Sequence, residues 1–122
     1  MNSNQERIPG KNPRNDIEAT ITFLPTEHGG KKDSAHHYGY RPQFYYDGHD
    51  WDAQHNYPDV EVAMPGDTVR ALLCFTMPEK HVGKLHVGKP FLIREGKHVV
   101  GYGTITAILD LGKSEAGHVT EK

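Results

Sequence analysis

The stretch KPFLIREGKHVVGYGTITAILDL (residues 89–111) contains two apolar, branched runs that meet at Glu95-Gly96. Two such runs around a short Gly-containing turn are typical of a β-hairpin. Gly101 and Gly103 fall on one face of the second run, because side chains alternate along a strand. Two glycines on one face indicate close packing or a corner, as small closed barrels require.

Two other segments show the same alternation as the hairpin. In residues 16–24 the apolar side chains occupy every second position, which predicts a strand with one face in water. Residues 67–77 are predicted to turn five side chains inward, namely Val69, Ala71, Leu73, Phe75 and Met77. Cys74 lies in this run and is interpreted as a small buried core residue.

The middle of the chain supplies the remaining predicted strands. Residues 41–46 form one, and Pro42 should lie at its start or at an edge because proline has no backbone N–H. If Phe44 faces the core, Arg41 and Gln43 face away from it.

Residues 60–64 (VEVAM) are predicted as the sixth strand, and the Pro65-Gly66 that follows is typical of a type II turn. The preceding residues 47–59 are irregular in pattern, with room for a short strand around Trp51.

These segments predict an all-β fold, a six-stranded antiparallel closed β-barrel. No segment shows a convincing helical period, and closure would remove exposed strand edges. We expect the barrel to occupy residues 16–111. The polar ends, rich in Gly or Pro, are predicted to be a disordered arm at residues 1–15 and a flexible tail at residues 112–122.

Composition excludes several classes of protein. The chain has 122 residues, enough for one domain, and a formal net charge of -2, so it carries no strongly basic field for nucleic acid. Its single cysteine rules out an intramolecular disulfide and a multi-cysteine metal site. It shows no signal-peptide core and no apolar stretch of membrane-spanning length. We therefore expect a cytoplasmic protein without a membrane partner.

Four motifs occur in one order along the chain. They are residues 39–45 (GYRPQFY), residues 64–67 (MPGD), residues 93–96 (IREG) and the glycine-rich last strand. In this order the chain resembles the C-terminal barrel, the third domain, of elongation factor Tu. The resemblance runs from about residue 16 to residue 109 and implies the same six-stranded barrel.

The resemblance implies contact with RNA. The family's barrel contacts the T-stem of aminoacyl-tRNA, packs on a GTPase domain and helps to bind an exchange factor. Carried over by motif, the RNA-binding residues are Lys31, Lys32, Gln43, Glu95 and Gly96. Lys31 and Lys32 stand where the family has Arg and His.

Two positions depart from the family's RNA-contacting pattern. Asp52 falls near the position of a family Thr, and Met77-Pro78 replaces Lys-Pro. Residues 46–67 contain six acidic residues and no Lys or Arg, which opposes phosphate binding, whereas residues 78–98 contain five cations.

The alternative interpretation is a protein–protein interaction module that binds a translational GTPase, an exchange factor or another protein. Three residues are candidates for that partner surface, namely Tyr40, Arg41 and Trp51.

Catalysis is not expected. The chain has no phosphate-binding loop and no Asn-Lys-x-Asp motif, so we predict neither GTP binding nor GTP hydrolysis, and no cofactor. Two loops hold several possible zinc ligands or acid–base groups, namely His36, His37, His49, Asp50, Asp52 and His55. Their spacing matches no zinc motif, so surface histidines without a metal are predicted.

Overall fold

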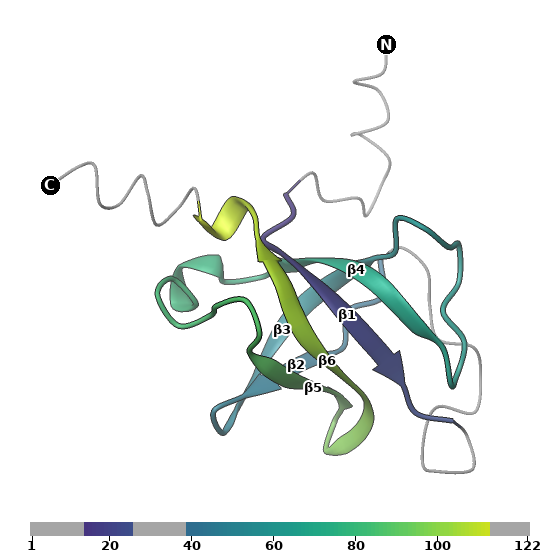
Figure 1. Ribbon diagram of the computed structural model, residues 1–122. Coiled ribbons are helices and arrows are strands. Elements are labelled where there is room, and N and C mark those ends of the chain that lie inside the picture. The colour runs from purple at the N-terminus through teal and green to yellow at the C-terminus, as the bar shows by residue number, and fades with distance from the viewer. Residues whose placement is uncertain (1–13, 26–38, 113–122) are drawn as a thin grey trace, which may run out of the picture.

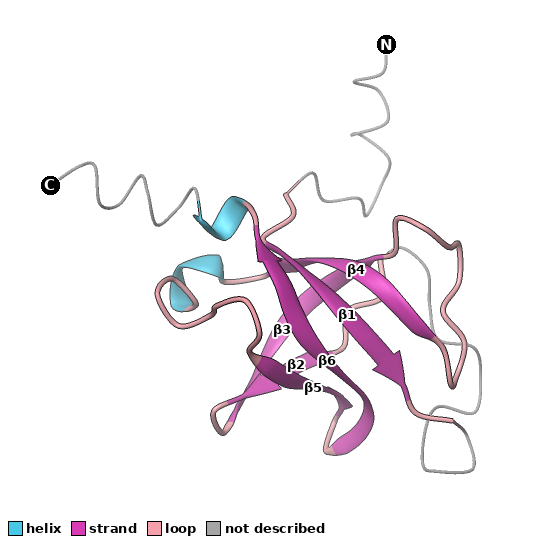
Figure 2. Cartoon of the chain, viewed as in Figure 1, coloured by secondary structure: helices cyan, strands magenta, loops and turns pink. Residues whose placement is uncertain are grey.

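The computed structural model describes residues 14–25 and 39–112, and these form a closed antiparallel β-barrel (Figures 1 and 2). Its strands are β1 (Ile17–Phe23), β2 (Gln43–Tyr46), β3 (His49–Asn56), β4 (Thr68–Phe75), β5 (Pro90–Glu95) and β6 (His98–Ile108). Around the barrel they follow the order β1-β4-β3-β2-β5-β6, with β6 pairing back on β1. A single 3-10 turn, η3 (Pro78–Lys80), lies between β4 and β5. The predicted fold class is confirmed.

Alternation builds the core as expected from the sequence. In β1 the side chains of Ile17, Ala19 and Ile21 are fully buried, and Phe23 follows them on the same face. In β4 four of the five predicted inward residues are buried, but Met77 lies beyond the end of the strand and is 42% exposed. Its predicted inward position was wrong because the alternation stops with the strand at Phe75. Cys74 is buried, as predicted.

The glycines of β6 allow the barrel to close. A Cβ atom on Gly103 would lie 2.5 Å from the ring of Phe91 and 2.7 Å from the carbonyl oxygen of Thr20. A Cβ atom on Gly101 would lie 2.8 Å from the carbonyl oxygen of Thr22. The close packing inferred from these glycines is therefore present between β6 and its neighbours β1 and β5.

The predicted strand at residues 60–64 is wrong. The chain from residue 57 to residue 67 contains no strand, and Val60 and Met64 are 42% and 46% exposed. The strand that pairs with the far edge of β4 is β3, which lies earlier in the chain and starts its pairing at Ala53. With β1 on its other side, β4 has no free edge for another strand.

Two tight turns have the chemistry that their backbone requires. Asp47 and Gly48, between β2 and β3, both have positive φ, at 50° and 85°, as in a type I′ hairpin. Gly66 has a φ of 90°, and the Asp67 N–H donates to the Met64 carbonyl at 2.9 Å, so the predicted Pro-Gly turn is confirmed.

Replacing Gly103 by alanine tests the close packing. The new methyl group would have to displace Phe91 or the β1 backbone, so we expect Gly103→Ala to lower the free energy of unfolding by about 1–3 kcal/mol. Gly112→Ala is the control, because its nearest contact is the Ile108 side chain, at 3.3 Å instead of the 2.5 Å found at Gly103. Equal denaturant midpoints for the two variants would contradict this account of closure.

Candidate binding surface

The predicted RNA-binding residues that the structure describes lie on two adjacent strands and in the turn that follows one of them. Gln43 begins β2 and faces outward, as the alternation with buried Phe44 predicted. It pairs with Arg94 of β5, whose next residues are Glu95 and Gly96. The register therefore brings these three predicted residues to one part of the barrel. Lys31 and Lys32 lie outside the described residues.

Arg94 spans β2 to reach an acid on β3. Its Nη2 donates to Asp50 Oδ2 at 3.1 Å, and its guanidinium carbon lies 4.4 Å from the ring centroid of Tyr45. The Arg94 and Asp50 side chains are only 18% and 26% exposed. A cation held by a carboxylate and an aromatic face in a half-buried position is well fixed.

Glu95 is held by a tyrosine. The Tyr40 hydroxyl donates to Glu95 Oε2 at 2.5 Å. Burial, and then the neighbouring Glu95 carboxylate, raise the pKa of Tyr40, so its phenol stays protonated. The Tyr40 ring also lies edge-on to His55, with 5.3 Å between centroids. Tyr40 thus packs against the core and holds the end of β5 next to the β5–β6 turn.

Gly96 leaves its backbone open. Its φ of 62° suits the first position of a two-residue hairpin turn, and a Cβ atom there would meet nothing within 4 Å. The neighbouring Lys97 is exposed and forms no ion pair with another described residue. The hairpin tip can therefore approach a partner's backbone closely.

The residues predicted as a partner surface pack against different neighbours. Trp51 is half-buried and lies edge-on to His81, with 4.8 Å between centroids. Tyr40 is held by Glu95, as above. Arg41 is exposed, and its Nη2 donates to Gln54 Oε1 at 3.1 Å. Of the three, Arg41 is the one that solvent reaches freely.

Half of the acids in residues 46–67 are neutralised by ion pairs. Asp47 pairs with Lys89 at 3.3 Å, and Asp50 pairs with Arg94. Asp59 accepts two hydrogen bonds from Arg70, at 3.0 and 3.1 Å. These pairs reduce the negative field of the segment, and they also use cations that would otherwise be free to meet a phosphate.

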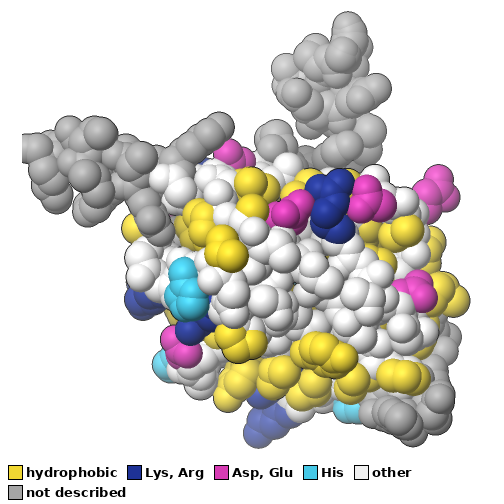
Figure 3. Space-filling view, viewed as in Figure 1, with side chains coloured by type: hydrophobic (Ala, Val, Ile, Leu, Met, Phe, Trp, Pro, Cys, Tyr) yellow, Lys and Arg dark blue, Asp and Glu magenta, His cyan; other side chains and the backbone are white. Residues whose placement is uncertain are grey.

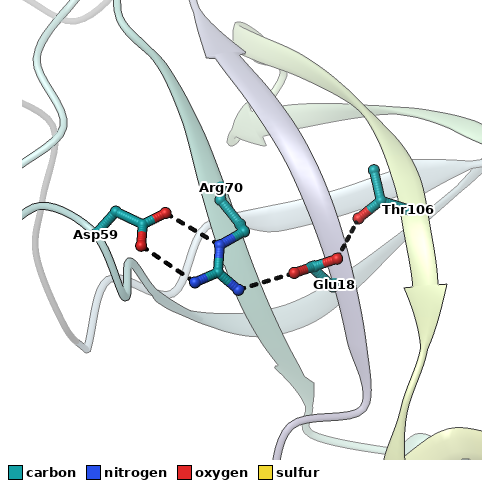
Figure 4. Close-up of polar contacts among 4 residues, drawn as sticks. All are labelled: Glu18, Asp59, Arg70 and Thr106. Carbon is teal, nitrogen blue, oxygen red and sulfur yellow. Dashed lines mark hydrogen bonds and ion pairs between the residues drawn. The ribbon is translucent and has the colours of Figure 1, made fainter.

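Arg70 extends its ion pair across three strands (Figure 4). Its Nη1 donates to Glu18 of β1 at 2.9 Å, and the same carboxylate accepts the Thr106 hydroxyl of β6 at 2.8 Å. Hydrogen bonds from Arg70 lower the pKa values of both Glu18 and Asp59. The network ties the segment after β3 to the outer face of β4, β1 and β6.

A largely apolar groove lies along β2, β5 and β6. It encloses about 450 Å³ and is lined by side chains that include Tyr45, Pro90, Leu92 and Tyr102. Tyr102 is 50% exposed. Figure 3 shows apolar side chains gathered on the lower part of the face that carries β5 and β6.

The histidines of the described chain do not form a metal site. Among residues 14–25 and 39–112, no group of three or more His, Cys, Asp or Glu side chains could hold a metal ion. His36 and His37 lie outside these ranges. His49 is exposed, as predicted, but His55 is fully buried, with Nδ1 2.8 Å from the Tyr57 hydroxyl. The surface position predicted for His55 was wrong because its strand turns that face into the core.

These observations define a closed six-stranded antiparallel barrel, the architecture of a translation-factor β-domain. The chain matches the family described as "Elongation factor Tu C-terminal domain" over residues 11–109 and belongs to that family. The matched domain is a non-catalytic β-barrel. No helix in the described part of the chain is long and apolar enough to cross a membrane.

Burial of His55 makes stability depend on pH. Burial lowers the pKa of His55 from 6.5 to about 3. Above pH 6.5 the ring is neutral in both states. As the pH falls below 6.5 the unfolded chain binds a proton that the folded chain does not, so stability falls until about pH 3. At pH 5 the loss is about 2 kcal/mol.

Chemical denaturation at pH 7.5 and pH 5 measures this loss. His55→Asn should have a lower free energy of unfolding than the wild type at pH 7.5. It should not show the further loss of about 2 kcal/mol that His55 causes between pH 7.5 and pH 5. The exposed His49 gives the control, since His49→Asn should keep it. A wild-type pH dependence in His55→Asn would contradict the assignment.

Proposed function

We propose that this protein is a binding module that contacts an RNA stem, with aminoacyl-tRNA as the first candidate. The contact would use Gln43, Glu95 and Gly96, together with Lys31 and Lys32. The observation that carries the proposal is the pairing of Gln43 with Arg94, which places the outward glutamine beside the open Glu95-Gly96 turn. We also propose that it acts in the cytoplasm without catalysis.

The charge distribution supports weak and salt-sensitive binding. Four of the eight described Lys and Arg side chains pair with carboxylates, namely Arg14, Arg70, Lys89 and Arg94. Affinity for RNA scales with the number of phosphates that cations neutralise. With few free cations on the barrel, we expect dissociation constants in the range of about 10⁻⁴–10⁻⁶ M at physiological salt.

A titration of labelled aminoacyl-tRNA at several salt concentrations tests the proposal. The double variant Lys31→Ala, Lys32→Ala should bind more weakly and should show a shallower dependence of affinity on salt, since up to two phosphate contacts are lost. Gln43→Ala should also weaken binding, but with little change in the salt dependence, because its amide carries no charge.

The matched control removes two charges elsewhere. Lys80 and Lys84 are exposed, lie in and after η3, and form no ion pair with another described residue. The double alanine variant at these positions should bind closer to wild type. The absence of binding by the wild-type chain at low salt would reject the RNA proposal.

The apolar groove favours a second candidate function, the binding of a protein partner. Tyr45, Leu92 and Tyr102 contribute apolar and aromatic surface of the kind that anchors protein interfaces, and the Asp47–Lys89 ion pair also lines the groove. A translational GTPase or an exchange factor is the proposed partner.

Binding to a purified translational GTPase and to an exchange factor, each after nuclease treatment, tests this candidate. Tyr102→Glu should abolish the interaction because it places a charge in the groove. Val60→Glu is the control, as Val60 is 42% exposed and does not line the groove. Equal binding by the two variants would exclude the groove as the interface.

A further inference from the structure

Two buried polar atoms on the candidate surface have no hydrogen-bond partner. They are the Gln43 side-chain oxygen, Oε1, and the Arg94 Nε. The two residues are direct neighbours across β2 and β5. Buried polar groups are nearly always hydrogen-bonded, and leaving one without a partner costs about 1–3 kcal/mol. An unsatisfied acceptor beside an unsatisfied donor therefore needs an explanation.

The explanation lies in the direction of the Arg94 side chain. Its cross-strand neighbours are Gln43 on β2 and, beyond it, Asp52 on β3. Its guanidinium is instead bonded to Asp50, which pairs with Tyr45, two residues further along β2. Arg94 therefore crosses β2 diagonally and stacks on Tyr45.

We propose that the Asp50–Arg94 ion pair is a clasp that limits the affinity of this surface for RNA. The inference rests on the RNA-binding function proposed above. In this proposal Arg94 is an additional RNA contact, and Asp50 competes with the RNA phosphate for its guanidinium. A phosphate presents oxygens to a guanidinium in the same bidentate manner as a carboxylate. When phosphate displaces Asp50, Arg94 moves off β2 and the Gln43 oxygen becomes accessible to the ligand.

Asp52 provides a matched control for Asp50. It lies two residues away on β3, faces the same side of the sheet and pairs directly with Gln43. It is exposed and makes no ion pair with another residue in the described ranges. Asp50→Asn and Asp52→Asn each remove one negative charge from the same face, but only the first opens the clasp.

The experiment titrates both variants with a short RNA duplex across a range of salt concentrations. Asp52→Asn should bind the RNA about two-fold more tightly, because the loss of one carboxylate weakens the negative electrostatic field of this face. Asp50→Asn should gain about ten-fold at low salt, and its log–log salt dependence should steepen by about one phosphate contact. When Arg94→Gln is also present, the affinity gained from Asp50→Asn should be no larger than the affinity gained from Asp52→Asn. Equal gains in affinity for Asp50→Asn and Asp52→Asn would overturn the clasp but would leave the RNA-binding proposal intact.

A second measurement reports on the clasp without RNA. Exchange of the Arg94 Nε–H with water, followed by NMR, should be slow in the wild type and in Asp52→Asn but fast in Asp50→Asn. Unchanged exchange in Asp50→Asn would overturn the inference. If exchange becomes fast and no variant binds RNA at low salt, the proposed function fails, and the role assigned to the clasp fails with it.

Discussion

Closure of the barrel depends on how closely β6 approaches β1 and β5. At Gly103 the Thr20 carbonyl and the Phe91 ring occupy the space that any Cβ atom would need, so a larger residue would push the strands apart. Every strand in the closed ring has a partner on each side, so no strand edge is left exposed. The same closure explains why residues 57–67 cross the surface as an irregular segment.

Once the ring is closed, its strand order decides which outward side chains meet. β2 is short, at four residues, and lies between β3 and β5. A long side chain on β5 can cross β2 and reach β3 because adjacent strands lie only about 4.8 Å apart, and Arg94 does so to pair with Asp50. This geometry puts Asp50 of β3 and the Glu95-Gly96 turn on one surface. In the proposed clasp, a carboxylate and a phosphate would compete there for the Arg94 guanidinium.

The sequence predicted those strands and turns whose signal lies within a few consecutive residues. β1 and β4 follow from alternation, the Pro65-Gly66 turn follows from fixed and positive φ, and the β5–β6 hairpin follows from its Gly96 turn. The same kind of signal was present in Asp47-Gly48, an I′ turn dipeptide that could have predicted the β2–β3 hairpin. Residues 60–64 alternate just as well and form no strand, because pairing needs a free neighbour as well as a pattern.

By itself the sequence determined the barrel, its family and the outward direction of Gln43, since alternation and turn chemistry act over a few residues. Tertiary structure alone decided the partners that meet across strands. The burial of His55, the hydrogen bond from Tyr40 to Glu95 and the ion pair of Arg94 with Asp50 are set by the tertiary structure. Each depends on which strands lie side by side around the ring. The acidic count of residues 46–67 therefore overstated the negative field of that segment, since three of its six acids pair with Lys or Arg from later in the chain.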